Sequence, residues 1–305
     1  MPAWNELLTE FEGLADDPSK VVWLDQRPVN ALKAIATARN RNVIFYASAW
    51  LQKPGASAML LQLTHEELNG FMSVMHGMDW SRGLTLLLHT PGGVTNAAET
   101  IVAYLRSKFT DIEVIVPTFA MSAGTMISLA ADRIVMGRQS QLGPIDPQIP
   151  LGGRTVSARA IVDQFGLART EILLNTTAAH LWAPVLQSAG PSLLQEAVNA
   201  LGYGESMVAK WLEQYMFKSS TDAANLGAAA AKHFNDAATH KSHGRRIDRD
   251  EARRQQIVVD DLESDQSLQD AVLTAYHATT ILFEKTLSAK VIFSDSGRRW
   301  VKNAG

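Results

Sequence analysis

Two glycine-containing turns hold the residues of this chain that could perform covalent chemistry. The sequence HTPGG ends in Gly92 and Gly93, and the sequence FAMSAGT contains Ser122 followed by Ala123. A serine placed where a strand gives way to a helix is exposed, and the positive end of the helix dipole favours a developing negative charge beside it. The N–H of Ala123 and the N–H of Gly92 or Gly93 could then donate to a substrate oxyanion, because glycine lets the backbone approach closely.

Each turn alone has an ordinary structural explanation. A glycine pair between a strand and a helix most often only makes the turn, and a serine before a helix most often caps it. The positions of the two turns change this interpretation, because each follows the strand of a consecutive strand–helix pair. In a parallel open sheet, ligands bind beyond the carboxyl ends of the strands, so loops after neighbouring strands can face each other. Together the turns predict a nucleophilic serine beside an oxyanion hole.

The apolar pattern predicts the elements that must position these turns. Apolar runs without alternation are typical of strands buried on both faces, and they occur at residues 42–50, 84–89, 112–117 and 133–137. Helical spacing of apolar residues separates these runs at 64–78, 94–109 and 122–131. Strands that alternate with helices predict βαβ units and a mainly parallel sheet. Further helical patterns follow at 155–176, 178–201, 204–217 and 266–288.

The overall composition limits the classes of protein to be considered. The chain has 305 residues, 46% of them hydrophobic, which is enough for a sizeable core, and its net charge of −3 gives no footprint for nucleic acid. It has no cysteine, which excludes disulfides, a cysteine nucleophile and cysteine-ligated metals, and suits the cytoplasm. We expect no signal peptide and no membrane span. We expect an N-terminal helical arm over 1–40, with an amphipathic helix at 4–14, and a single domain over 41–305 that is mostly helical from about residue 155.

Several blocks of the sequence resemble one protein family. YASAWLQKPG, NGFMSVMHGMD, LHTPGG, VPTFAMSAGTMI, SQLGPIDPQI and HKSHGRRIDRDEAR look like blocks of the serine dehydrogenase proteinase family, and the resemblance covers nearly the full length. That family is related to Clp proteases, crotonases and signal peptide peptidase A. The resemblance implies an α/β, Clp protease/crotonase-like fold with a mainly parallel sheet of repeated ββα and βαβ units and a helical C-terminal half. It also implies a serine peptidase-like protein in which Ser122 is the nucleophile.

The base that activates the serine stays open in the sequence. Clp-type peptidases carry a histidine downstream of the serine, but the matching region here, GPIDPQ, has Asp146 instead. The later segment HKSHG contains His243, and the residues after it resemble the Clp-type segment that follows the third triad residue. We therefore predict His243 as the base and Asp146 as the carboxylate that orients its ring. Lys241 or Lys210 is the alternative base, if it is desolvated enough to be neutral.

Asp146 and two further histidines, His89 and His240, have ordinary structural interpretations. Asp146 lies between two prolines, so its side chain could instead stabilise a rigid turn. His89 precedes the glycine turn at a strand end, and we expect it to pack or to form hydrogen bonds locally. We expect His240 to be solvated.

We predict a serine peptidase that hydrolyses peptide bonds of a peptide or protein substrate through an acyl-enzyme. One alternative is a catalytically degenerate member of the same fold that binds peptides or proteins. Others are an α/β-hydrolase-type esterase with Ala120-x-Ser122-x-Gly124 as its nucleophile elbow, and a crotonase-like acyl-thioester enzyme without a nucleophile. We expect no cofactor and no metal, since there is no H-E-x-x-H motif. We expect a homo-oligomer, with apolar helices of residues 155–217 as interfaces.

Overall fold

The computed structural model describes residues 3–304, which form two compact units. The first, which we call the sheet unit, contains the chain up to Leu142 and from Arg246 onward. The second, which we call the helical unit, contains Gly143–Arg245. Between residues 3 and 304, no helix combines the length and apolar character that crossing a membrane requires.

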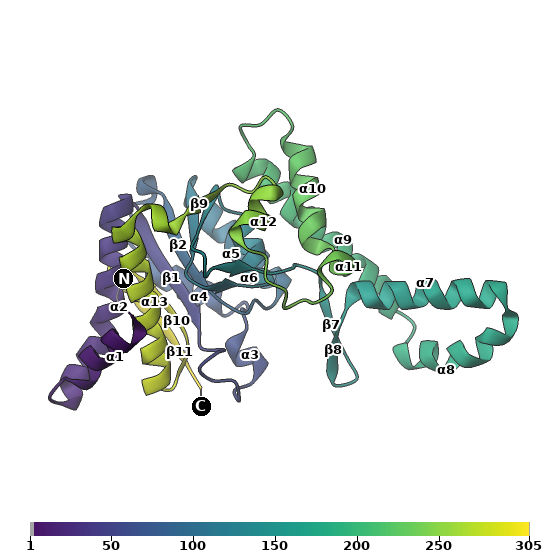
Figure 1. Ribbon diagram of the computed structural model, residues 1–305, viewed down its shortest axis with the longest axis horizontal. Coiled ribbons are helices and arrows are strands. Elements are labelled where there is room, and N and C mark those ends of the chain that lie inside the picture. Colours follow the sequence, from purple (N-terminus) through teal and green to yellow (C-terminus); the bar gives the residue numbers. More distant parts are fainter. Residues whose placement is uncertain (1–2, 305) are drawn as a thin grey trace. The chain divides into compact units, whose positions relative to one another are not determined.

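A seven-stranded sheet forms the centre of the sheet unit (Figure 1). Across the sheet, the strands are β11 (Arg299–Asn303), β10 (Ser288–Ser294), β1 (Asn42–Ser48), β2 (Leu84–His89), β3 (Ile112–Val116), β5 (Arg133–Met136) and β9 (Val259–Asp261). The five strands from β1 to β9 are parallel, whereas β10 is antiparallel to both β1 and β11. The carboxyl ends of β2 and β3 therefore meet at the same edge of the sheet.

The central strands are held together by apolar side chains on both faces. Every residue of β1, β2 and β3 is buried. Phe45, Leu87, Ile115 and Val135 lie opposite one another in register across four parallel strands, and all four belong to one hydrophobic cluster. Continuous apolar runs thus give a rigid platform from which the turns after β2 and β3 project.

Helices cover both faces of this sheet (Figure 1). The helices α1 (Trp4–Glu12), α2 (Asp17–Arg39) and α13 (Gln266–Lys285) pack on the face that carries Phe45. On the other face, Tyr46 packs against Phe71 of α4 (Glu67–Met75), with ring centroids 6.3 Å apart. The remaining elements of the sheet unit are α3 (Ala58–Leu61), η1 (Trp80–Arg82), α5 (Thr95–Arg106), β4 (Phe119–Ala120), α6 (Ala123–Leu129), β6 (Gln141–Leu142), α12 (Arg249–Arg254) and η4 (Leu262–Ser264).

The helical unit begins with a β-hairpin that leads into a series of helices (Figure 1). Its elements are β7 (Gln148–Leu151), β8 (Arg154–Ser157), α7 (Ala158–Leu174), η2 (Thr176–Ala178), α8 (Ala179–Ala189), α9 (Leu193–Trp211), the π-helix η3 (Leu212–Met216), α10 (Ala223–Asn235) and α11 (Ala237–His240). A small hydrophobic cluster built on Ile161 and Leu201 joins α7 to α9, and β7 and β8 pack against it.

The mainly parallel sheet and the α/β class that the sequence predicts are confirmed. The continuous helix expected over 178–201 is wrong, because Gly190, with φ of +79°, and Pro191 separate α8 from α9. The hairpin of β7 and β8 and the strands β10 and β11 were not expected. The division into a helical arm and a single domain stays a prediction.

Candidate active site

The two turns singled out in the sequence lie side by side in the sheet unit. Thr90 pairs with Ala120 as an isolated parallel bridge. The N–H of Thr90 donates to the carbonyl of Phe119 at 2.9 Å, and the N–H of Met121 donates to the carbonyl of Thr90 at 3.1 Å. These bonds continue the parallel pairing beyond the ends of β2 and β3. They bring the turn at residues 91–93 against the turn that contains Ser122.

Position 92 has no room for a side chain, because Ser122 occupies the space beside it. A Cβ atom at Gly92 would lie 2.6 Å from the Cβ of Ser122, 2.6 Å from the carbonyl oxygen of Met121 and 3.0 Å from the nitrogen of Ala123. Its φ of +96° is also unfavourable for any residue with a side chain. The glycine therefore allows the backbone of one turn to touch the serine of the other.

At Gly93 a third segment, which contains Leu63, packs so closely that only glycine fits. The N–H of Leu63 donates to the carbonyl of Gly92 at 2.8 Å, and the N–H of Val94 donates to the carbonyl of Leu63 at 2.9 Å. A Cβ at Gly93 would lie 2.2 Å from the carbonyl oxygen of Leu63. Residues 91–94 are thus fixed on one side by Leu63 and on the other by the serine turn.

Ser122 has a backbone conformation that few residues other than glycine adopt. Its φ and ψ are +51° and −116°, and it stands directly before α6. Its side chain forms no capping hydrogen bond to that helix. Capping of α6 therefore does not explain why a serine stands at position 122. A strained, non-glycine conformation of this kind costs on the order of 1–3 kcal/mol and is typical of functional sites.

The amide groups of the two turns differ in whether they have an acceptor. The N–H of Gly92 donates to Thr90 Oγ1 at 3.1 Å, and the N–H of Gly124 donates to the carbonyl of Met121 at 2.7 Å. Within residues 3–304, no acceptor is recorded for the N–H of Gly93 or of Ala123. Ala123 is the first residue of α6, where an N–H has no partner within the helix. The two glycines differ, and Gly93 rather than Gly92 is the one with a free donor.

His89 packs beneath the glycine turn, as the sequence predicts. It is fully buried, and its Nδ1 lies 2.9 Å from Thr118 Oγ1. Trp50, Phe119 and Tyr276 surround its ring, with centroids 5.0–6.3 Å away. Burial lowers the pKa of His89 from 6.5 to about 3, so the ring is neutral. His89 supports the end of β2 and holds no charge.

A buried ion pair lies behind the segment that contacts Gly93. Lys290 of β10 pairs with Glu67 at the start of α4, and both side chains are almost completely buried. Lys290 also donates to the carbonyl of Gln62 at 3.0 Å. Glu67 accepts from the N–H and the hydroxyl of Thr64, at 2.7 and 2.8 Å. The pair therefore anchors Gln62 and Thr64, the two residues that flank Leu63.

Asp146 and His243 form a hydrogen-bonded pair within the helical unit. His243 Nδ1 lies 2.7 Å from Asp146 Oδ1, although 97 positions separate the two residues in the sequence. The Asp146 side chain is only 3% exposed, and its Oδ2 accepts from Gln148 Nε2 at 2.7 Å. The His243 side chain is 30% exposed. With Nδ1 engaged by the carboxylate, the basic atom that His243 can offer is Nε2.

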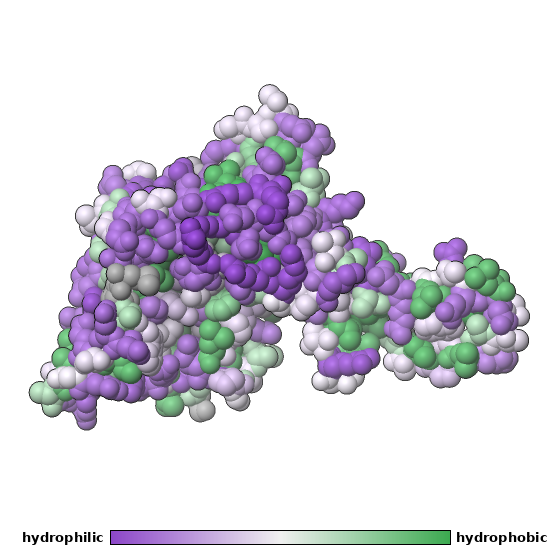
Figure 2. Space-filling view, viewed as in Figure 1, coloured by the Kyte–Doolittle hydropathy of each residue, from purple (hydrophilic) through white to green (hydrophobic). Residues whose placement is uncertain are grey.

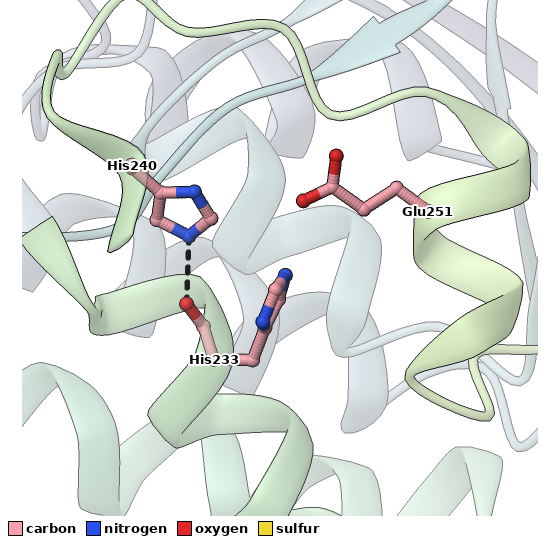
Figure 3. A group of neighbouring side chains, drawn as sticks. All are labelled: His233, His240 and Glu251. Carbon is pink, nitrogen blue, oxygen red and sulfur yellow. Dashed lines mark hydrogen bonds between the residues drawn. The ribbon is translucent and has the colours of Figure 1, made fainter. Parts of the chain in front are cut away.

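The other basic residues expected near the site have different surroundings. Lys241 and Lys210 are exposed, so neither meets the condition of desolvation. His240 was expected to be solvated, and this is wrong, because it is only 3% exposed. Figure 3 shows its Nε2 bonded to the carbonyl oxygen of His233, at 2.7 Å. Its Nδ1 lies 3.0 Å from Arg245 Nη1, so both ring nitrogens have partners.

Comparison with known proteins finds a family that part of this chain resembles. Residues 73–166 match a family described as ClpP-like SDH-type serine proteinase. This stretch, less than a third of the chain, is similar to that serine proteinase family. It contains Gly92, Gly93, Ser122 and Asp146, whereas His243 lies beyond it. The α/β fold with a mainly parallel sheet is the ClpP-like fold of the family.

Individual relatives cover smaller parts of the chain. Two uncharacterized proteins of Methanocaldococcus jannaschii are similar to it, one 39% identical over 87 residues and the other 46% identical over 66 residues. The matches cover 28% and 22% of this chain, and it spans only 30% and 23% of the length of these relatives. A mutant of a membrane-bound stomatin-specific protease matches 39% of this chain and 58% of its own, at 22% identity and a TM-score of 0.28.

Proposed function

We propose that this chain is a serine peptidase that hydrolyses peptide bonds through an acyl-enzyme, with Ser122 as its nucleophile. Membership of residues 73–166 in a serine proteinase family supports the class of reaction. The observation that carries the proposal is the strained Ser122, uncapped and in contact with Gly92, beside two amides without acceptors. A serine that only ended a strand would adopt a relaxed conformation and cap its helix.

The proposed reaction begins with proton transfer from Ser122 Oγ to His243 Nε2. Oγ then attacks the substrate carbonyl carbon, and the N–H groups of Gly93 and Ala123 donate to the oxyanion that forms. Asp146 holds the ring of His243 through Nδ1 and stabilises its positive charge. His243 next returns the proton to the leaving amine, which breaks the peptide bond and leaves an acyl group on Ser122. Water, activated by His243, releases the acid product.

The proposal is tested with the full chain and a library of peptide substrates. We expect cleavage by the parent protein and none by the Ser122→Ala variant. Ser128→Ala is the matched control, because Ser128 lies in the same helix but uses its hydroxyl to bond the carbonyl of Gly124. It should retain activity. Equal activity of the parent and Ser122→Ala would overturn the proposal, and peptide binding without cleavage would favour a non-catalytic binding protein of the same fold.

We also propose that the protein forms a homo-oligomer through the α7–α8 region. Leu173, Leu174 and Leu181 are 75–83% exposed, and α8 has no buried residue. By contrast, the apolar residues at the end of the expected interface region are buried within their own chain, namely Trp211, Leu212, Met216 and Phe217. Exposed leucines of this kind are typical of contact surfaces. Light scattering of the parent should give more than one chain, and Leu174→Asp/Leu181→Asp should give a smaller species; a monomeric parent would contradict the proposal.

A further inference from the structure

A small cavity in the sheet unit is lined only by charged side chains. Its volume is about 230 Å³, and its lining residues are Arg138, Arg246, Asp248, Arg249 and Asp250. They come from the loop after β5, from the segment that leads into α12 and from the first turn of α12. Figure 2 shows the most hydrophilic residues of this face gathered over the region of α12. Neither Ser122 nor the glycine turn contributes to this lining, so the cavity is separate from the proposed peptidase site.

Among the residues that the structure describes, two of the three guanidinium groups in this cavity form no ion pair, although the charge of Arg138 acts on Asp261 from a longer distance. Arg249 forms ion pairs with Glu263 at 2.5 Å and Asp261 at 3.1 Å. Arg246 uses Nη2 to bond the carbonyl oxygen of Arg138 at 2.6 Å, which holds its side chain in place without cancelling its charge. Within residues 3–304, no ion pair is recorded for Arg138 or Arg246.

The two aspartates of the lining are already engaged. Asp248 Oδ1 accepts from the N–H groups of Asp250 and Glu251, at 3.1 and 2.9 Å. Asp250 Oδ1 lies 3.4 Å from Arg253 Nη1, outside the cavity lining. Arg249 is already paired with Glu263 and Asp261, and Asp250 with Arg253, so Arg138 and Arg246 face Asp248 alone and the lining keeps a positive charge. Because each aspartate has a partner of its own, the arginines keep donors for a ligand.

We propose that this cavity binds a phosphoryl group. Arginine presents a planar fork of N–H donors that matches the oxygens of phosphate, and it cannot lose its charge. The lining has no apolar residue, and the volume is below the range of drug-sized pockets, so a small, strongly charged ligand fits best. Free phosphate and the phosphate of an ester share this chemistry. Arg138 and Arg246 would supply the contacts, and Arg249 would contribute with the donors that its ion pairs leave.

The proposal is tested by titrating the full chain with inorganic phosphate, at constant ionic strength set with sodium chloride, and measuring heat of binding. Saturable binding by the parent is expected. Arg138→Gln and Arg246→Gln should each weaken it about tenfold or more, because each removes a charge-assisted contact. Arg254→Gln is the matched control, since Arg254 is an exposed arginine at the end of α12 that does not line the cavity. It should bind as the parent does.

Three results would overturn the proposal. They are absence of saturable binding, equal weakening by Arg254→Gln, and unchanged affinity of Arg138→Gln, whose side chain makes no ion pair that folding depends on. Glycerol phosphate and sulfate complete the experiment. Tighter binding of glycerol phosphate would indicate an ester as the ligand, and tighter binding of phosphate would indicate the free ion. Sulfate binding as tight as both would show a general anion site and contradict selectivity for a phosphoryl group.

Discussion

Gly92 lies so close to Ser122 that only glycine fits there, since a Cβ at Gly92 would lie 2.6 Å from the Cβ of Ser122. The contact joins two turns that lie 30 positions apart in the chain but follow neighbouring parallel strands. The N–H of the next residue, Gly93, has no acceptor in the part of the chain that the structure describes. Gly92 therefore permits close packing of the two turns, and in the proposed mechanism Gly93 offers a donor to the oxyanion.

Replacing Gly92 by alanine should damage both stability and activity. The new Cβ would collide with Ser122 and with the carbonyl oxygen of Met121, and a positive φ adds strain. We expect the free energy of unfolding to fall by about 2 kcal/mol or more, measured by urea denaturation. Gly55→Ala is the control, because no atom lies within 4 Å of its Cβ position. Equal stabilities of the two variants would contradict the packing described for the turn.

Replacing Asp146 by asparagine should slow peptide cleavage without unfolding the protein. Asparagine keeps the size of the side chain but cannot stabilise a protonated His243, and it can hold the ring in the wrong tautomer. In serine proteases the equivalent loss lowers kcat about 10⁴-fold, and we expect an effect of that order. Asp163→Asn, an exposed aspartate of the same unit, should have parental kcat. An unchanged kcat for Asp146→Asn would remove Asp146 from the mechanism.

The buried and exposed lysine–glutamate pairs near the start of α4 should differ greatly in their contribution to stability. Lys290→Met leaves Glu67 buried without a counter-charge, which should cost about 3–5 kcal/mol. Lys302→Met breaks the exposed pair with Glu66, at 2.8 Å, and should cost less than about 1 kcal/mol. Chemical denaturation of both variants measures the difference. Similar values would show that the buried pair does not anchor residues 62–64.

His89 should make the protein less stable as the pH falls. Its pKa is about 3 in the folded state, against about 6.5 in an unfolded chain, so the unfolded state binds the extra proton between these values. Its contribution is complete above the unfolded pKa and is lost as the pH falls toward the folded one. Between pH 7 and pH 5, the loss should be about 2 kcal/mol.

The comparison for His89 uses two variants and denaturation at each pH. His89→Phe removes the titrating group from the core, so the part of the pH dependence due to it should disappear, whatever the variant's stability at pH 7. His76→Gln changes an exposed histidine and should keep the parental slope. If His89→Phe has the parental slope as well, the buried ring is not the source of the effect.

The sheet around the glycine turns could be predicted because its strands carry their signal locally. β2 and β3 are continuous apolar runs, and the small residues after them mark the turns. β10 was missed because Lys290 stands in the middle of it, and a lysine in a buried strand is not expected unless its partner is known. That partner, Glu67, is more than 200 positions away, so only the folded chain shows why the lysine is tolerated.

Part of the candidate site could likewise be predicted from the sequence, and part of it depends on the fold. Ser122 and the glycines could be identified from residue types at the ends of consecutive strands, but the strained φ of Ser122 and the contact between Gly92 and Ser122 depend on the fold. His243 and Asp146 were paired in the sequence through chemistry and family resemblance, since no local pattern links them. His240 was misjudged because its partners, His233 and Arg245, are defined by how α10, α11 and the following loop fold together.

The most direct test of the account is covalent labelling of the full chain with a fluorophosphonate, followed by mass spectrometry of its peptides. The account predicts one adduct, on Ser122, and a strong loss of labelling rate in His243→Ala, because an unassisted hydroxyl is a weak nucleophile. An unlabelled parent, an adduct on another residue, or a rate that His243→Ala leaves unchanged would contradict the claim that His243 activates Ser122.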